Sequence, residues 1–313
     1  MEFIPLVLGP TAAGKTELAH RAARVISQES EKTEVEIISA DSRAIYKRLN
    51  IGTATPLPRQ RRELNYHLIS FLDPRERYSA MDFRRDVEEK LEEITSRGNL
   101  PLLVGGSRLY IKALTEGIFE GPSADEELRE SLSKKSGEEL HGELEEVDPP
   151  SAEKIHPHDK KRLIRALEVH RLTGRPISEL KQEAEPISQS VKKIGLKKSK
   201  EELYRQIGDR VEEMLERGLL EEVEELVEAG FGPEWGSWET IGYKELVPVV
   251  QGDRTLEEAK ELIKKNTRHL ARYQLSWLRS EGEVNWIDLE ERGRAEAEKA
   301  ILKFLRGAKY RLP

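Results

Sequence analysis

Eight residues near the amino terminus form the strongest chemical motif in the chain. They read GPTAAGKT from Gly9 to Thr16 and fit the pattern G-x-x-x-x-G-K-[ST]. An apolar run, Phe3 to Leu8, precedes the motif, and a stretch with helical periodicity, Glu17 to Ile26, follows it. In such a loop the backbone N–H groups and the helix N-terminus bind phosphate oxygens, Lys15 reaches across the phosphates, and the Thr16 hydroxyl ligates Mg²⁺. The motif therefore predicts a di- or triphosphate site with Mg²⁺ as its cofactor.

Two polar loops are expected beside this motif, and a pair of arginines occurs later in the chain on a helix where such side chains are usually solvated. Asp41 and Ser42 follow the second predicted strand, and a second glycine-rich turn, GGSRLY, begins at Gly105. The Asp41 carboxylate could hold Mg²⁺ through water, cap a helix or act as a general base, and its position alone leaves these alternatives open. Arg205 and Arg210 lie on the predicted helix after the fifth strand, where an arginine aimed at a bound pyrophosphate would form a bidentate clamp.

Short apolar runs alternate with helical periods and predict the elements that position these groups. The expected strands are Phe3–Leu8, Glu34–Ser39, His67–Phe71, Pro101–Val104, Val191–Leu196 and Val284–Ile287. The expected helices between them are Lys15–Ile26, Ala80–Arg97 and Ser107–Thr115. This alternation indicates an α/β fold with a doubly wound parallel sheet of the P-loop NTPase type. Right-handed crossovers place the loops after the first, second and fourth strands along one edge of the sheet.

A helical segment interrupts this alternation in the middle of the chain. Between about Gly117 and Pro186, Glu, Lys and Ser dominate and the apolar spacing is helical, most clearly from Lys160 to Gly174. We expect an inserted helical domain at 118–186 within a core formed by 1–117 and 187–313. The rest of the chain is mainly helical, with expected helices at Lys200–Arg217, Leu219–Ala229, Thr240–Val250, Thr255–Ser280 and Arg292–Leu305.

Basic side chains recur on one face of the predicted helix that starts at Thr255. They are Lys260, Lys264, Arg268 and Arg272. Like charges four residues apart cost an isolated helix about 0.2–0.5 kcal/mol per pair, and a solvated surface is one interpretation of them. The other is a surface for an anionic partner, with Tyr273 and Trp277 available for stacking on bases. The insertion holds a second basic cluster, formed by Lys160, Lys161, Arg162, Arg165 and Arg171. Two basic elements suit a long polyanion better than a small metabolite.

Composition narrows the class of protein. The 313 residues contain 35% charged side chains, a formal net charge of −7 and no cysteine. The absence of Cys excludes disulfides and Cys-based zinc sites, and the seven histidines show no metal-binding spacing. No apolar run approaches the roughly 18 residues of a membrane span, and a strand starting near Phe3 leaves no room for a signal peptide. We expect a soluble, cytoplasmic protein with no membrane partner, whose overall acidity hides local basic patches.

The ordered motifs resemble the tRNA dimethylallyltransferase family, also called tRNA isopentenyltransferases, of the bacterial type. They run from GPTAAGKT through DSRAIYKRLNIGTATP, YSAMDFRRD and PLLVGGSRLY to IHPHD, IGYKE and TRHLARYQLSWLR, and so cover nearly the whole chain. The resemblance implies transfer of a dimethylallyl group from its diphosphate to N6 of the adenosine at tRNA position 37, next to the anticodon. The products would be N6-(dimethylallyl)adenosine and diphosphate. It also implies a base-flipped tRNA as the partner, and a monomer.

The resemblance assigns roles to residues of this chain. It implies Asp41 as the general base, with Thr11, Lys15, Ser107 and Arg210 at the reacting centre and Thr16 on Mg²⁺. The implied diphosphate-binding residues are Gly9, Pro10, Thr11, Ala12, Ala13, Gly14, Lys15 and Thr16. The implied tRNA-binding residues are Asp41, Ser42, Arg43, Ala44, Ser107, Arg129, Lys161, Arg162, Arg165, Gly242, Tyr243, Lys244, Arg268, Arg272, Gln274, Trp277 and Arg279.

Three other hypotheses share parts of this pattern. A prenyltransferase for free adenine nucleotides would use the same loop and base, but would leave the insertion without a purpose. A phosphate-loop kinase for a small metabolite would release ADP. A non-catalytic RNA-binding protein would use the nucleotide only as a switch.

Overall fold

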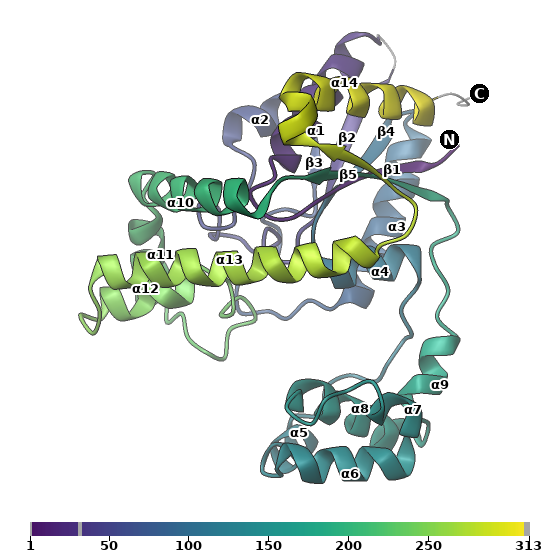
Figure 1. Ribbon diagram of the computed structural model, residues 1–313, viewed down its shortest axis with the longest axis vertical. Helices are drawn as coiled ribbons and strands as arrows, with labels where there is room; N and C mark the ends of the chain where they lie inside the picture. The colour runs from purple at the N-terminus through teal and green to yellow at the C-terminus, as the bar shows by residue number, and fades with distance from the viewer. Residues whose placement is uncertain (1, 31–32, 310–313) are drawn as a thin grey trace. The chain divides into compact units, whose positions relative to one another are not determined.

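The computed structural model describes residues 2–30 and 33–309, and its centre is a six-stranded parallel sheet (Figure 1). The strands are β1 (Ile4–Leu8), β2 (Val35–Ala40), β3 (Tyr66–His67), β4 (Leu100–Gly105), β5 (Val191–Lys197) and β6 (Val284–Asp288). They are ordered β3-β2-β4-β1-β5-β6, and every pairing is parallel. The predicted parallel α/β sheet is therefore confirmed.

The register of the sheet brings the ends of three strands together. Leu8 at the end of β1 pairs with Gly105 of β4 on one side and with Gly195 of β5 on the other. Gly105 also pairs with Ala40, the last residue of β2. The loops that follow β1, β2 and β4 therefore start from adjacent positions on the carboxyl edge, where ligands bind in open α/β sheets.

Helices cover the sheet and bury its apolar strands. The elements are α1 (Lys15–Gln28), α2 (Pro58–Glu63), α3 (Ala80–Ser96), α4 (Arg108–Thr115), α10 (Lys200–Glu216), α11 (Leu219–Glu228), α12 (Tyr243–Val250), α13 (Leu256–Ser280) and α14 (Leu289–Lys309). Helices α1 and α14 lie side by side over one face, where Val7, Ile194 and Ile301 join a common core (Figure 1). A second core unites α11, α12 and α13 around Tyr243 and Leu246.

The third strand is shorter than the periodicity predicted. The apolar run from His67 to Phe71 was expected to be one strand, but β3 ends at His67. Leu68 and Ser70 adopt positive φ angles of 56° and 47°, which interrupt the extended backbone. The N–H groups of Ser70 and Phe71 donate to backbone carbonyls of the loop after β2, so this segment supports that loop instead of extending the sheet.

The chain divides into two compact units. We call Met1–Ile111 together with Ser188–Pro313 the core unit, and Lys112–Ile187 the insertion unit. The insertion unit contains α5 (Glu126–Ser133), α6 (Gly137–Val147), α7 (Pro149–Ala152), α8 (Lys160–Thr173) and α9 (Ile177–Gln182). These helices enclose a separate core that includes Leu140, Leu144, Leu163 and Leu167. No helix in the described part of the chain is long and apolar enough to cross a membrane.

Candidate active site

The loop from Gly9 to Thr16 forms a tight turn that opens α1. The backbone folds back through a hydrogen bond from the Ala13 N–H to the Pro10 carbonyl, 3.3 Å long. Ala12 and Gly14 have φ angles of 63° and 85°, and alternation of left- and right-handed residues turns successive N–H groups toward one concavity. The loop therefore combines a backbone anion cradle with the N-terminus of a 14-residue helix.

Two consecutive glycines let the strand ends approach this loop. A Cβ on Gly105 would lie 2.2 Å from the Ala40 carbonyl oxygen, and one on Gly106 would lie 2.7 Å from the Gly9 carbonyl oxygen. Real side chains do not tolerate such distances to backbone atoms, so both positions need glycine. The site is thus built from three backbone segments in direct contact.

A pair of serines links the loops after β2 and β4. The Ser42 N–H donates to Ser107 Oγ at 2.9 Å, and the Ser107 hydroxyl donates to Ser42 Oγ at 3.3 Å. Beside them, Asp41 is exposed, and its Oδ1 accepts the Arg43 N–H at 2.9 Å. Within the described residues, Asp41 Oδ2 has no hydrogen-bond partner, so one carboxylate oxygen is free to accept a proton or a ligand. Ala44 is buried and offers no polar group.

Two cations and one carboxylate dominate the electrostatics of the site. Lys15 donates to the Pro10 carbonyl at 2.7 Å and has no acidic partner among the residues described. Burial lowers the pKa of Lys15 to about 8; Asp41 raises it in part and the positive charge of Arg210 lowers it further. Burial likewise lowers the pKa of Arg210, against the attraction of Asp41. Cations that lose hydration without gaining an ion pair are suited to receive an anionic ligand.

The two candidate arginines of α10 have different environments. Arg205 is exposed and makes ion pairs with Glu202 and Asp209, at 2.7 and 2.8 Å, so it is not aimed at the glycine loop. Arg210 is only partly exposed, and no ion pair of its side chain occurs in the described structure. Helical periodicity shows both on one helix but does not show which one faces the glycine loop.

The oxygen donors near the loop fit Mg²⁺ held jointly with a phosphate. Thr16 is exposed at the start of α1, and its hydroxyl has no hydrogen-bond partner in the described residues. Those residues contain no cluster of three His, Asp, Glu or Cys side chains that could hold a metal ion. Mg²⁺ characteristically uses one or two protein oxygens together with substrate phosphates and water, so a single hydroxyl suits it.

Helix α13 reaches the site through Gln274. The Thr11 N–H donates to Gln274 Oε1 at 2.7 Å, and Gln274 Nε2 donates to the Gly106 carbonyl at 3.0 Å. With 8% of its surface exposed, this side chain lies inside the protein. The Thr11 hydroxyl has no partner among the described residues and remains free for a ligand.

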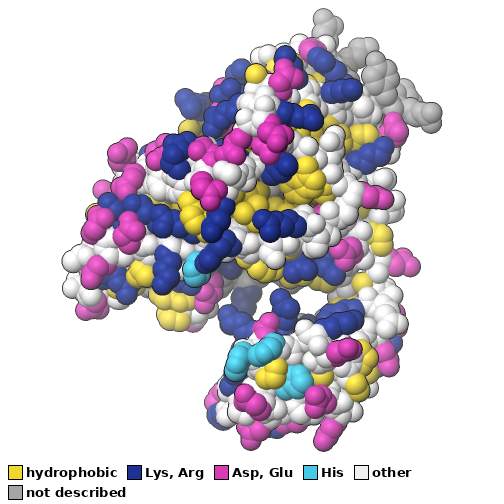
Figure 2. All heavy atoms as spheres, in the orientation of Figure 1, with side chains coloured by type: hydrophobic (Ala, Val, Ile, Leu, Met, Phe, Trp, Pro, Cys, Tyr) yellow, Lys and Arg dark blue, Asp and Glu magenta, His cyan; other side chains and the backbone are white. Residues whose placement is uncertain are grey.

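The cations of α13 separate into two groups. Lys260 and Lys264 make ion pairs with Glu212 of α10, at 3.4 and 2.8 Å, so these two cations belong to a solvated, charge-paired stretch of the helix. The remaining cations, which have no acidic partner in the described structure, are Lys265, Arg268, Arg272 and Arg279. The Arg268 guanidinium lies 5.6 Å from the Tyr204 ring centroid, and its Nε is buried without a hydrogen-bond partner. Figure 2 shows basic side chains mixed with acidic ones along the band of surface that α13 forms.

Two aromatic residues expected at the RNA surface are buried. Trp277 is 4% exposed, so its ring is not available for stacking. Tyr243 is fully buried, donates from its hydroxyl to Glu222 Oε1 at 2.6 Å, and accepts the Gly52 N–H at 3.0 Å. An amphipathic pattern shows that an aromatic residue lies on one face of a helix. It does not show whether that face packs into the core or binds a ligand. On either side of Tyr243, Gly242 is the N-cap that precedes α12, with a φ of 102°, and Lys244 pairs with Glu239 at 2.7 Å.

A buried carboxylate organises the basic residues of the insertion unit. Glu168 is fully buried and accepts hydrogen bonds from Arg129 Nε at 2.8 Å and Arg165 Nη1 at 2.6 Å. Both arginines keep about a third of their side-chain surface exposed, 32% and 34%. Lys161 is exposed, and Arg162 lies 3.2 Å from Asp159. Sequence reasoning found the cations here but not the carboxylate that holds two of them in place.

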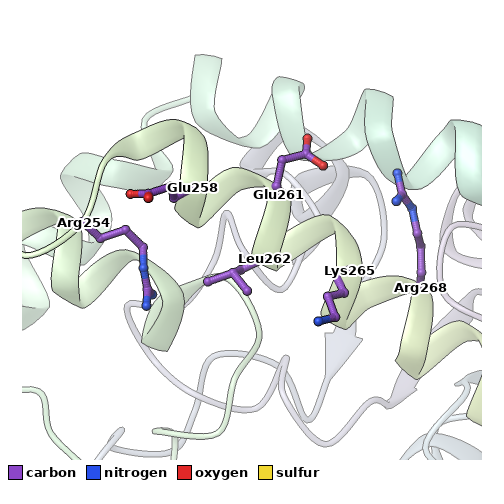
Figure 3. Close-up of a pocket in the computed structure, with 6 residues that line it drawn as sticks. All are labelled: Arg254, Glu258, Glu261, Leu262, Lys265 and Arg268. Carbon is purple, nitrogen blue, oxygen red and sulfur yellow. The ribbon is translucent and has the colours of Figure 1, made fainter.

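An open pocket along α13 does not belong to the glycine loop. Its lining residues are Arg254, Glu258, Glu261, Leu262, Lys265 and Arg268 (Figure 3). The carboxylates of Glu258 and Glu261 would repel phosphate groups. The arrangement at the glycine loop is therefore the better candidate for a diphosphate site.

Comparison with known proteins identifies the family. The family model described as IPP transferase matches residues 44–281. The chain is 44% identical to tRNA dimethylallyltransferase 2 of Geotalea uraniireducens over 293 residues, covering 91% of this chain and 92% of that protein. It is 41% identical to the tRNA dimethylallyltransferase of Thermotoga maritima over 305 residues, covering 96% and 97% of the two chains.

Solved structures agree with this result. The full-length tRNA isopentenylpyrophosphate transferase of Bacillus halodurans superposes with a TM-score of 0.71 at 34% identity, covering 99% of this chain and 97% of that one. A eukaryotic dimethylallyltransferase acting on tRNA gives a TM-score of 0.79 at 27% identity, covering 96% and 78%. The chain therefore belongs to the IPP transferase family, whose curated members matched here are tRNA dimethylallyltransferases.

Proposed function

We propose that this protein transfers the dimethylallyl group of dimethylallyl diphosphate to N6 of the adenosine at tRNA position 37 and releases diphosphate. The observation that carries the proposal is the grouping of an anion cradle, two unpaired cations, Lys15 and Arg210, and the exposed carboxylate of Asp41. The anion cradle and the two cations suit a departing diphosphate, and the carboxylate of Asp41 suits removal of a proton.

The reaction forms one bond and breaks another. The N6 lone pair of adenine attacks C1 of the dimethylallyl group while the bond from C1 to the diphosphate oxygen breaks. Because that lone pair is delocalised into the ring, attack needs loss of an N6 proton, which the free oxygen of Asp41 accepts. The cradle amides, Lys15 and Arg210 stabilise the charge that develops on the leaving group.

Mg²⁺ completes the proposed diphosphate site. The hydroxyl of Thr16 would ligate it together with diphosphate oxygens. When bound, the ion would neutralise charge on the leaving group.

The free cations support tRNA as the partner. Arg268, Arg272 and Arg279 on α13 are available for phosphate contacts, as are Lys161 and the exposed edges of Arg129 and Arg165 in the insertion unit. The target base must leave its stack to reach the loop after β2, so we propose a base-flipped complex. We further propose that the protein acts as a monomer in the cytoplasm.

The decisive test is product formation. The protein is incubated with dimethylallyl diphosphate, Mg²⁺ and unmodified tRNA, and the nucleosides are analysed by mass spectrometry. We expect N6-(dimethylallyl)adenosine at position 37. Its absence, or ADP release when ATP is supplied with a small acceptor, would overturn the proposal. AMP in competition with tRNA separates a transferase for free nucleotides from one for tRNA.

The Asp41→Asn variant tests the proposed base. It keeps the oxygen that accepts the Arg43 N–H but cannot take a proton, so kcat should fall about a hundredfold or more. Calorimetry should show diphosphate binding retained or tightened, because a negative charge beside Lys15 and Arg210 is removed. Asp253→Asn, at an exposed position, is the matched control. A near-normal kcat for Asp41→Asn would remove this residue from the role.

A further inference from the structure

One side chain joins the diphosphate loop, the turn after β4 and the helix that carries free cations. Gln274 extends from α13 and uses both ends of its amide, accepting from the Thr11 N–H and donating to the Gly106 carbonyl. The two bonds are 2.7 and 3.0 Å long and bridge segments far apart in the chain, since Thr11 and Gln274 are separated by 263 positions.

The surroundings of the amide place it against the anion site. A Cβ built on Gly106 would lie 3.0 Å from Gln274 Nε2, 2.7 Å from the Gly9 carbonyl oxygen and 3.6 Å from Lys15 Nζ. The Gln274 amide, the first glycine of the loop and the lysine ammonium therefore converge on one point. A displacement of the glutamine would therefore change the packing around Gly106, next to the first glycine of the loop.

The contacts of Gln274 are those of a support for the loop. The side chain is 8% exposed, and its carbonyl oxygen is occupied by Thr11. Without Gln274, the half-buried Thr11 N–H would have no acceptor among the described residues, and the loss of that hydrogen bond favours rearrangement of the loop. The amides that follow in the loop would then lose their fixed orientation toward an anion, and preorganisation of such donors is what gives them their strength.

We propose that Gln274 is a positioning residue that fixes the diphosphate loop against the β4–α4 turn, so that the helix presenting cations to RNA also sets the grip on diphosphate. The inference rests on the proposed function. Arg272 and Tyr273, which immediately precede Gln274, are both exposed, so RNA contact and loop support are adjacent on α13.

The test compares diphosphate binding with RNA binding. Gln274→Met keeps the length of the side chain and removes both hydrogen bonds, whereas Gln274→Glu keeps an acceptor for the Thr11 N–H but cannot donate to the Gly106 carbonyl. Ser276→Ala, at an exposed position on the same helix, is the control. Affinity for inorganic diphosphate with Mg²⁺ is measured by calorimetry without RNA, and KM values for dimethylallyl diphosphate and tRNA are measured separately.

The expected result is a selective loss. Gln274→Met should bind inorganic diphosphate about threefold to tenfold more weakly, the scale of one or two lost hydrogen bonds. Its KM for dimethylallyl diphosphate should rise by a similar factor, while its KM for tRNA stays within twofold of wild type. Gln274→Glu should weaken diphosphate binding at least as much, because it also adds negative charge at the site. Ser276→Ala should bind diphosphate like wild type.

Two results would overturn the inference. One is a diphosphate affinity within twofold of wild type in the folded variants; if Gln274→Met does not fold, Gln274→Glu decides. The other is a rise confined to the KM for tRNA, which would make Gln274 a direct RNA contact. Failure of the proposed function is distinguishable, since wild-type protein would then form no prenylated adenosine even though calorimetry still reports on the loop.

Discussion

Replacing the buried carboxylate of the insertion unit should destabilise that unit selectively. Glu168 Oε1 accepts the Asp125 N–H and Arg129 Nε, and Oε2 accepts Arg129 Nη2 and Arg165 Nη1. In Glu168→Gln one oxygen becomes an NH₂ group facing guanidinium donors, so two charge-assisted hydrogen bonds are lost. Each is worth about 1.5–3 kcal/mol, and partial exposure lets both arginines recover some hydration. The net loss should be about 2–3 kcal/mol of unfolding free energy.

Two optical probes separate the units in a urea titration. All four tryptophans, Trp235, Trp238, Trp277 and Trp286, lie in the core unit, whereas far-UV circular dichroism reports on helices in both. The variant should show an earlier transition by circular dichroism and an unchanged tryptophan transition. Glu153→Gln, at an exposed position of the insertion unit, is the matched control and should change stability by less than about 0.5 kcal/mol.

The pH dependence supplies an independent check. Burial alone would raise the pKa of Glu168, but hydrogen bonds from Arg129, Arg165 and the Asp125 amide outweigh it and hold the pKa below its ordinary 4.5. A lowered folded-state pKa means that the contribution is complete above about pH 4.5 and declines as pH falls below that value. Wild type should therefore lose stability more steeply than Glu168→Gln below this pH. Equal stability of the two proteins at neutral pH, or parallel pH profiles, would refute the reasoning.

Three other substitutions test separate parts of the core unit. Arg210→Gln should weaken diphosphate binding, measured by calorimetry, by about tenfold, which is the scale of a charge-assisted hydrogen bond. The control Arg205→Gln should stay within twofold of wild type. Equal effects of the two substitutions would contradict the placement of Arg210, and not Arg205, at the diphosphate site. Tyr243→Phe removes the buried hydroxyl that donates to Glu222 Oε1 and accepts the Gly52 N–H, and should cost about 1–3 kcal/mol in urea unfolding. A neutral effect would mean that water replaces the hydroxyl. Gly105→Ala sets a Cβ 2.2 Å from a backbone oxygen and should lower the melting temperature by several degrees, unlike Gly142→Ala, where the added Cβ meets nothing within 4 Å.

The sequence predicts the sheet well because its buried strands are short apolar runs bounded by turn residues. It fails from His67 to Phe71, where apolar side chains occur on a backbone with two positive φ angles. The periodicity of a sequence shows which side chains are apolar. It does not show which φ angles the backbone adopts when other segments of the fold contact it. The extent of this strand was therefore beyond the reach of local pattern.

Some residues of the candidate site could likewise be predicted from the sequence, and others could not. The loop ending in Lys15 and Thr16 and the strand-end Asp41 are local features, and the sequence places them together through the geometry of a parallel sheet. The supporting groups Gln274 and Glu212 are different, because their partners lie on other elements and their own positions fit ordinary helix patterns. A carboxylate that neutralises cations on a neighbouring helix has no signature in either helix alone.

The place of the insertion in the strand order has a consequence for how such proteins diversify. Residues 112–187 lie in the connection from β4 to β5, and both strands pair with β1. The two strands are therefore only about 10 Å apart, but because both run parallel to β1 the connection must also return along the length of the sheet, which takes a crossover of about a dozen residues or more. Because closing a longer connection costs little extra entropy, this segment can grow, shrink or be exchanged as a cassette without shifting any strand register. Residues of the insertion unit that contact a nucleic acid can therefore change while the sheet that holds the candidate catalytic groups stays the same.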